Sequence, residues 1–257
     1  MLDTSKLIVD HTLSTFGGQG SVMLAPRWLP SRIYGHLGNT PGAELSQKIT
    51  KKAFKESQTG KRQTVGYRIT EREGELALKI QAFRKNLDLI LNGLTFSKAA
   101  GTVTEEALPA GLVVGNIVGL QNMGVSELVI KDSAAQPATL VEGKHYEYSV
   151  HGGIRFLDVA GFTQPFKADY KYEATESSTV MSGGLREYAV RIEGLNADDG
   201  EPVLIELWRV GGDPVDKLAL ISDDTEVFDL KLPLMADLSR PAEGPLGQFG
   251  RITFLKK

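Results

Sequence analysis

The chain of 257 residues contains no cysteine. This absence excludes a disulfide framework, a zinc site built on thiolates and a cysteine nucleophile. It is typical of a protein kept in a reducing compartment. The sequence also lacks an apolar run of 18 residues and an apolar stretch after a basic start. It therefore predicts neither a membrane-spanning helix nor a secretory signal peptide.

Catalytic signatures are missing as well. No G-x-S-x-G, H-E-x-x-H or P-loop motif occurs. The G-x-G in FGGQGSV has no strand-to-helix context, no third glycine and no lysine, so it does not predict a nucleotide-binding loop. The acidic pairs Asp198-Asp199 and Asp223-Asp224 stand beside Gly or Thr, where Asp favours turns through local hydrogen bonds. We expect no enzyme, no cofactor and no metal site.

Hydrophobic residues make up 41% of the chain, which is enough for a substantial core. The net charge of −3 hides an uneven distribution. Residues 1–100 carry 15 Lys and Arg against 8 Asp and Glu (+7), whereas residues 101–257 carry 14 against 24 (−10). Parts of opposite charge can attract each other between copies, but ordinary solvated faces explain the same numbers equally well.

A tyrosine-rich stretch, LVEGKHYEYSVHGGIRFLDVAGFTQPFKADYKY (140–172), predicts a three-stranded meander. In KHYEYSV the aromatic residues alternate with a polar set that begins at His145, which places this histidine on the polar face of a strand. Gly152 and Gly153 permit the positive φ of a tight hairpin, so His151 is expected in a turn. Two histidines on different elements, with no third ligand, make a poor metal site.

A long hairpin is predicted at about residues 44–82. Its first strand runs through ELSQKITKKAFK, its polar tip is ESQTGKR, and leucines alternate with polar residues in the return strand. Such a hairpin cannot bury both faces within one monomer, so its distal half either extends into solvent or docks on another subunit. The basic residues near the tip are Lys51, Lys52, Lys55, Lys61 and Arg62.

One helix is predicted in NLDLILNGL, with Asn86 as its N-cap and Gly93 at its end. A second helical turn is plausible in DPVDKLALI, with Asp213 as its cap. The apolar stripe of the first helix consists of Leu87, Ile90, Leu91 and Leu94. Further strands are expected in LVVGNIVGL, SELVIKD, REYAVRIEGL and PVLIELWRV.

These elements favour an all-β fold, a β-sandwich or barrel of antiparallel strands with one packed α-helix. No composition change indicates a linker, so residues 1–257 are expected to form a single domain. It begins with an irregular N-terminal arm at about residues 1–40, rich in Gly and Pro.

The order of the segments resembles the major tail tube protein of long-tailed, siphovirus-like bacteriophages, from about residue 40 onward. The segments that carry the resemblance are ITEREGELALKIQAFRKNLDLILNGL, VGNIVGL, SELVIKD, LVEGKHYEYSVHGGIRFLD, FKADYKY, REYAVRIEGLNADDGEPVLIELWRV and PLGQFGRITF. No single motif among them is diagnostic.

This resemblance implies a tail tube-like fold and a structural virion protein. Six copies join their inner sheets into a ring, and rings stack into a hollow tube that delivers phage DNA into the host. The implied partners are further copies of the chain and the tape measure, tail terminator and distal tail proteins. Double-stranded DNA passes without specific binding, no membrane is involved, and the tail is assembled in the host cell cytoplasm.

Two sets of residues acquire roles under this resemblance. The five basic residues of the hairpin are expected between stacked rings, where a repeated heterologous contact propagates a stack. A bore for DNA should repel phosphate rather than bind it, which makes Glu71, Glu73 and Glu75 candidates for its lining.

Two alternatives remain open. The chain could be the inner tube of a contractile tail or secretion machine, which has the same barrel and hexamer but assembles inside a sheath. It could also be a β-sandwich carbohydrate-binding virion module that stacks Trp28 and Trp208 on sugars. The apolar context LIELWRV favours a core or interface position for Trp208.

Overall fold

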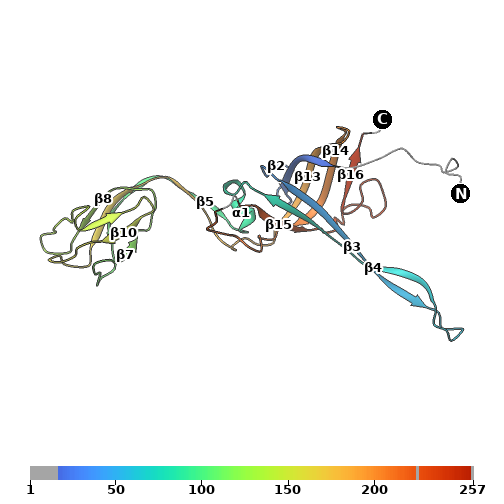
Figure 1. Ribbon diagram of the computed structural model, residues 1–257, viewed down its shortest axis with the longest axis horizontal. Coiled ribbons are helices and arrows are strands. Elements are labelled where there is room, and N and C mark those ends of the chain that lie inside the picture. Colours follow the sequence, from blue (N-terminus) through green and yellow to red (C-terminus); the bar gives the residue numbers. More distant parts are fainter. Residues whose placement is uncertain (1–16, 224–225, 256–257) are drawn as a thin grey trace, which may run out of the picture. The chain divides into compact units, whose positions relative to one another are not determined.

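The computed structural model describes residues 17–223 and 226–255 (Figure 1). Strands account for 48% of it and helices for 3%, which confirms the all-β prediction. The chain divides into two compact units. Unit 1 comprises Met1–Leu94 with Thr179–Lys257, and unit 2 comprises Thr95–Ser178. The sequence predicts one domain without a linker, whereas the structure has two units, each with its own core.

Unit 1 contains two antiparallel sheets. The larger has the order β16-β14-β13-β1-β2 and the smaller has the order β15-β4-β3. The strands of the larger sheet are β1 (Gly18–Pro26), β2 (Gly35–His36), β13 (Glu187–Asn196), β14 (Pro202–Gly211) and β16 (Gly250–Phe254). Those of the smaller sheet are β3 (Gly42–Lys55), β4 (Thr64–Ile80) and β15 (Phe228–Pro233).

The core of unit 1 lies between these sheets. Every second residue at the end of β4 points inward, so that Leu76, Leu78 and Ile80 are at most 2% exposed. They pack against inward residues of the larger sheet, among them Leu24 and Val190. Burying a side chain of this size stabilises the fold by about 1.5–3 kcal/mol. Unit 1 is therefore a β-sandwich, in which apolar faces of both sheets meet.

Strand β1 corrects the expectation of an irregular arm up to about residue 40. It pairs with β13 along its whole length, from Gly18 to Pro26, and its residues 22–25 are buried. The signal was present in SVMLA, a short apolar run that ends at a proline, which is typical of a buried strand. The first 16 residues of the arm lie outside the described residues.

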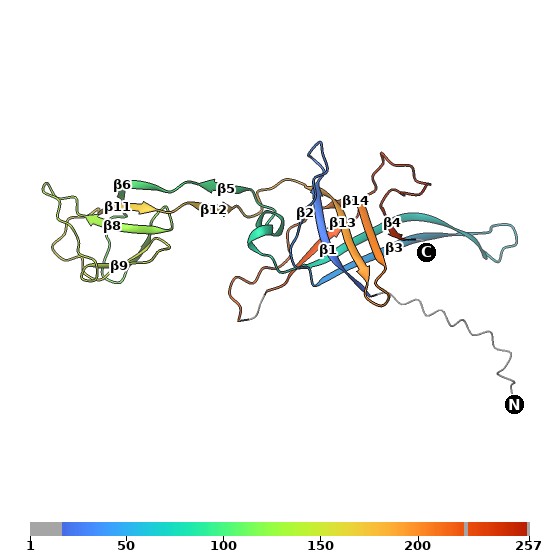
Figure 2. The same cartoon turned by 90° about the horizontal axis from the view of Figure 1, so that it is seen from above.

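The predicted hairpin is confirmed. Strands β3 and β4 pair from Gly42 opposite Lys79 to Lys55 opposite Thr64, with register shifts at Thr50/Lys51 and at Phe54/Lys55. Only the base of the hairpin is covered by the larger sheet, and the distal half extends beyond the other strands of unit 1 (Figure 2).

The predicted helix is shorter than its sequence pattern. A 3-10 turn, η2 (Arg84–Asn86), leads into α1 (Leu87–Ile90). The amide of Asn86 does not cap the helix; it donates to the carbonyl oxygens of Leu37 and Ala82, each at 2.8 Å. Asn92, with a φ of 45°, ends the helical turn, and Leu94 is exposed rather than packed. Residues 213–221, all of them described, form no helical turn, so that prediction was wrong.

Unit 2 is a second, smaller sandwich. One sheet has the order β7-β10-β9, the other has the order β6-β11-β8, and β5 pairs with β12 in a separate ribbon. The strands are β5 (Thr95–Lys98), β6 (Gly101–Ala107), β7 (Ile117–Gly119), β8 (Val125–Lys131), β9 (Tyr146–Tyr148), β10 (Gly153–Phe156), β11 (Lys167–Tyr172) and β12 (Thr175–Ser178).

The predicted meander is only partly correct. Strands β9 and β10 form the expected hairpin, with Gly152 at a φ of 87°. Strand β11, however, pairs with β6 and β8 in the opposite sheet. Its inward Ala168 and Tyr170 belong to the same core as Ile154 of β10. The sequence therefore predicted strand β11 but not the sheet that it joins.

The two histidines have different environments. His151 lies exposed in the turn, as predicted. His145 is not on a polar strand face; it is 8% exposed in the turn before β9. Its Nδ1 accepts a hydrogen bond of 2.8 Å from the backbone N–H of Val141, and Phe162 packs edge-on against its ring.

Candidate assembly surface

The base of the hairpin carries carboxylates on the face that points away from the core. Because Leu76 and Leu78 point inward, the residues that alternate with them point outward. Glu71, Glu73 and Glu75 therefore share one face of β4, which we call the acidic face. Glu73 forms an ion pair with Lys48 of β3, with Nζ and Oε2 2.9 Å apart, and the glutamate raises the pKa of Lys48.

Further carboxylates border the acidic face at its β15 end. Glu75 lines a shallow hollow of about 180 Å³ together with Asp213, Asp216 and Asp229. Lys231 in this hollow pairs with Asp216 at 2.6 Å, which raises the pKa of the lysine. Exposed pairs of this kind add little stability, so their main effect is on the local electrostatic potential, which is negative.

The distal half of the hairpin has the opposite charge. Between Ile49 and Thr70 every charged side chain except Glu56 is basic. The five basic residues singled out in the sequence all lie here and are exposed: Lys51, Lys52, Lys55, Lys61 and Arg62. The structure thus places both predicted sets on one hairpin. The basic set lies in its distal half and the acidic set lies at its base.

Apolar side chains are exposed on the same distal half. Val65, Tyr67 and Ile69 alternate on one face of β4 and are 68%, 70% and 42% exposed. We call them the apolar row. Lys51 and Ala53 of β3 stand opposite Ile69 and Tyr67 and share this face. A contiguous apolar face without cover is characteristic of an interaction surface.

The tip between the two strands has a defined shape. The carboxylate of Glu56 accepts hydrogen bonds of 2.9 Å from the backbone N–H groups of Gln58 and Thr59. The hydroxyl of Thr59 also donates to it, and this bond lowers the pKa of Glu56. Gly60 and Arg62 have positive φ values of 75° and 50°. The tip therefore presents Lys61 and Arg62 on a loop whose backbone is held by Glu56.

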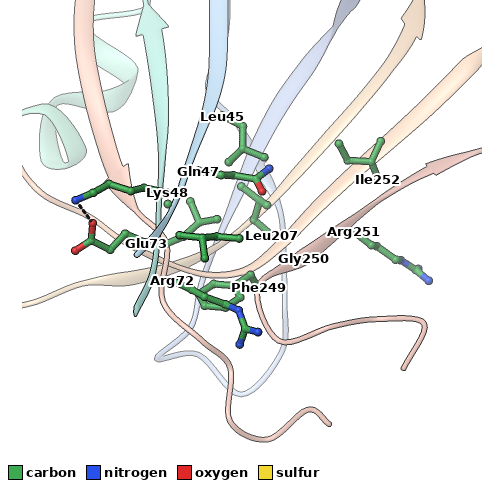
Figure 3. A pocket seen from close by; sticks show the side chains of 13 residues that line it. Leu45, Gln47, Lys48, Arg72, Glu73, Leu207, Phe249, Gly250, Arg251 and Ile252 are labelled. Carbon is green, nitrogen blue, oxygen red and sulfur yellow. Dashed lines mark hydrogen bonds and ion pairs between the residues drawn. The ribbon is translucent and has the colours of Figure 1, made fainter. Parts of the chain in front are cut away.

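A second feature of unit 1 is a groove between the two sheets. Two adjoining hollows of about 270 and 430 Å³ share Leu45, Leu207 and Ile252 in their walls. Figure 3 shows the narrower of the two. Strands β3 and β16 are edge strands of their sheets. Ile252 belongs to the inner face of the larger sheet yet is 51% exposed. We call this opening the interlayer groove.

The turn between β13 and β14 lies beside the wider hollow. Gly18 lines that hollow, and Gly18 pairs with Asn196 at the start of the turn. Residues 196–201, which we call the acidic turn, include three carboxylates and no basic residue. Asp199 accepts a hydrogen bond of 2.9 Å from the N–H of Glu201, which confirms the turn role predicted for this acidic pair. In the other pair, Asp224 lies outside the described residues.

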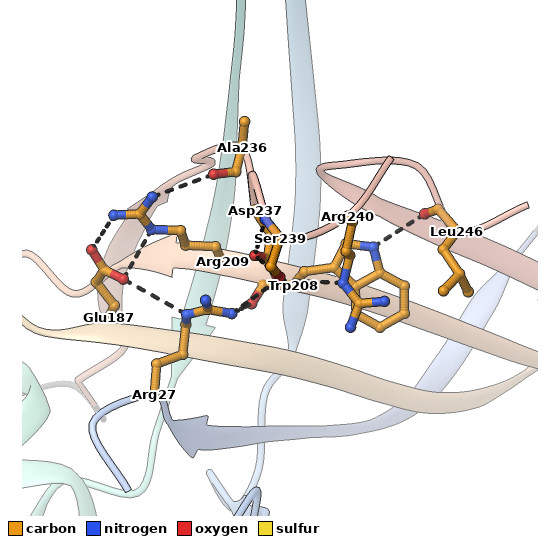
Figure 4. Close-up of polar contacts among 9 residues, drawn as sticks. All are labelled: Arg27, Glu187, Trp208, Arg209, Ala236, Asp237, Ser239, Arg240 and Leu246. Carbon is orange, nitrogen blue, oxygen red and sulfur yellow. Dashed lines mark hydrogen bonds and ion pairs between the residues drawn. The ribbon is translucent and has the colours of Figure 1, made fainter. Parts of the chain in front are cut away.

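The larger sheet also carries a polar cluster that the sequence did not suggest (Figure 4). Arg209 forms two hydrogen bonds with Glu187, and Arg27 reaches both Glu187 and Asp237. The hydroxyl of Ser239 donates to Asp237 at 2.7 Å, and this bond lowers the pKa of Asp237 to about 2. The members come from distant segments, so no local motif could reveal them.

Trp208 is buried beside this cluster. Its ring is 4% exposed, its Nε1 donates to the carbonyl oxygen of Leu246 at 3.1 Å, and Arg240 stacks over it at 3.9 Å. The core position favoured by the sequence is confirmed. Trp28 is 55% exposed and packs edge-on against Tyr188. The two tryptophans therefore offer no joint platform for a sugar.

Among residues 17–223 and 226–255, no three His, Asp or Glu side chains come together as ligands for a metal ion. Over the same residues, no helix is long and apolar enough to cross a membrane.

Comparison with known proteins gives one family. The family model described as "Protein of unknown function UCP028589" matches residues 15–253, which is nearly the whole chain. The chain therefore belongs to this family. No curated protein matches it.

Proposed function

We propose that this member of the UCP028589 family is a structural tail tube subunit. Copies of the chain assemble into hexameric rings, and the rings stack into the hollow tube through which phage DNA reaches the host. The resemblance in segment order supports this proposal, and so does the sandwich of unit 1 with the short helix α1.

One observation carries the proposal, namely the uncovered distal half of the β3–β4 hairpin. The apolar row on it is 42–70% exposed, although unit 1 has a well-packed core elsewhere. A long ribbon with exposed apolar residues and a free edge is an aggregation hazard in a monomer. In an assembly the same ribbon becomes a contact surface between copies.

The charge arrangement supports passage of DNA. A duplex carries about one negative charge per 1.7 Å of its length, and a basic bore would hold it through counterion release. The acidic face provides a surface that repels phosphate, while the five basic residues lie in the distal half of the hairpin. Under the proposal the acidic face lines the bore and the basic tips lie between rings.

Electron microscopy of the purified chain tests the proposal. We expect rings or tubes in negative stain at micromolar to millimolar concentration. A variant lacking Ser57 to Lys61 is the matched control, because it loses only exposed residues of the tip. It should keep the β-rich circular dichroism spectrum and fail to form tubes. A parent chain that stays monomeric at every concentration, or a deletion variant that forms normal tubes, would contradict the proposal.

The inner tube of a contractile tail or secretion machine rests on the same hairpin. It predicts the same rings but also assembly inside a sheath. Co-expression with the candidate sheath protein encoded nearby distinguishes the two, because only the contractile type should purify as a tube within a sheath.

A further inference from the structure

The distal hairpin and the interlayer groove are complementary in their apolar surface. The hairpin exposes Val65, Tyr67 and Ile69 in one row. The groove exposes apolar side chains of the sandwich interior, and the wider hollow has a volume of about 430 Å³. Covering both at once removes from water two apolar surfaces that a single copy leaves exposed, at a gain of about 25 cal/mol for each Å².

The charges beside the wider hollow are complementary to those of the hairpin too. The apolar row is flanked on its own face by Lys51 and Lys55 of β3. The acidic turn directly follows Leu195, which lines the wider hollow, and its Asp198 and Asp199 are exposed. Opposite potentials of this kind orient two surfaces and fix their register.

The hairpin cannot occupy the groove of its own copy. Ala43 of β3 lines the wider hollow, and Ala53, on the face of the apolar row, is ten positions further along the same strand. An extended strand rises about 3.3 Å per residue, so the two positions are separated by roughly 33 Å. The occupant of the groove must therefore come from a second copy.

We infer that the interlayer groove of one copy receives the distal hairpin of the next copy, with the apolar row in the groove and the lysines beside the acidic turn. This inference rests on the proposed function and identifies the acceptor of the hairpin. The contact joins two different surfaces of the same chain, so each copy that donates a hairpin also offers a free groove. A contact of this kind is heterologous. It can continue from copy to copy, because a dimer still has one free hairpin and one free groove.

Cysteine cross-linking tests the inference, because the natural chain has no cysteine. The test variant carries Ala43→Cys and Ala53→Cys, two small changes at exposed positions. A disulfide needs Cα atoms within about 7 Å, which excludes a bond within one copy. Under mild oxidation of assembled protein we expect a ladder of cross-linked copies on a denaturing gel, and its loss on reduction. The matched control pairs Ala53→Cys with Ser46→Cys, which lies on the opposite, outward face of β3.

The outcomes separate the inference from the proposed function. Tubes that give a ladder with the Ala43 pair and not with the Ser46 control support both. Tubes that give no ladder with the Ala43 pair overturn the groove as acceptor and leave the tube function standing. A cysteine-free parent that never assembles overturns both.

If the cysteine variant does not assemble, reversing the charges on the two surfaces tests the inference instead. Asp198→Lys with Asp199→Lys, or Lys51→Glu with Lys55→Glu, should each raise the concentration needed for assembly by about tenfold, which equals about 1.4 kcal/mol. The four changes together should restore it. If the combined variant is no better than either pair, the groove is not the acceptor.

Discussion

The two halves of the β3–β4 hairpin share one pattern and differ in what covers them. In the base, Leu76, Leu78 and Ile80 alternate with charged or small residues and are at most 2% exposed. In the distal half, Val65 and Tyr67 occupy equivalent alternating positions and are 68% and 70% exposed. Alternation thus selects a face in both halves, but only the second sheet decides whether that face contributes to the stability of the monomer.

The largest effect on the free energy of unfolding is expected from a substitution at the base of the hairpin, and it should differ from that of a substitution in the distal half. Leu78→Ala should lower the free energy of unfolding by about 3 kcal/mol, because it leaves a cavity in a fully buried site. Tyr67→Ala should change it by no more than about 0.5 kcal/mol in the monomer and yet impair assembly. Urea unfolding of dilute protein checks the first statement, and electron microscopy checks the second. Equal losses of stability would show that the distal half is covered in the monomer.

A buried polar group should also contribute to the free energy of unfolding. Asp237 is 3% exposed, and its pKa falls from 3.8 to about 2 on folding. Asp237→Asn should therefore cost about 2 kcal/mol at neutral pH. Since the folded pKa is the lower one, this contribution is complete above about pH 4 and is lost as the pH falls toward 2. Unfolding measured from pH 7 to pH 2 should show parent and variant converging; a constant difference would contradict the assignment.

The histidines of unit 2 offer a smaller contrast. His145→Ala removes the acceptor for the N–H of Val141 and should cost about 1 kcal/mol. His151→Ala changes an exposed turn residue and should cost almost nothing. Thermal unfolding of the two single variants measures the difference. A loss of stability in the His151 variant equal to that in the His145 variant would mean that exposure does not determine the cost.

A small effect on stability is also expected on the acidic face. Replacing Glu71, Glu73 and Glu75 with Lys should change the free energy of unfolding by no more than about 0.5 kcal/mol and should leave ring formation intact. Tubes of this variant should retain a DNA duplex and slow its release at low salt, and the effect should fade as salt screens the charges. Identical release from parent and variant tubes at every salt concentration would show that these glutamates do not line the bore.

The sequence predicted those features that depend on local periodicity. The hairpin, its inward leucines and the β9–β10 turn follow from alternation and glycine positions, and the structure has them. Strand β1 was missed because its apolar run is short and lies among glycines and prolines. His145 was misplaced because a turn with Gly143 at a φ of 77° precedes β9, and the alternation was extended one residue too far.

The parts of the assembly surface were predicted to different extents. The basic and acidic residues of the hairpin could be identified from sequence, since both sets lie on strands with regular alternation. The interlayer groove could not, because it depends on which strands end up at the sheet edges. Strand β16 begins 232 residues after Gly18 (250 − 18), and only the order of strands in the fold places both around one opening.

The β5–β12 ribbon has a consequence for how such a chain can be modified. Thr95 stands opposite Ser178, and just outside the ribbon the N–H of Thr179 donates to the carbonyl oxygen of Leu94 at 3.0 Å. The chain therefore leaves unit 1 after Leu94 and re-enters it at Thr179, next to the point where it left. Unit 2 is thus an insertion with adjacent ends, which we call the cassette. A gene that loses this cassette, or exchanges it for another domain with adjacent termini, keeps every strand of unit 1. The ribbon is a natural junction for recombination and for grafting foreign domains.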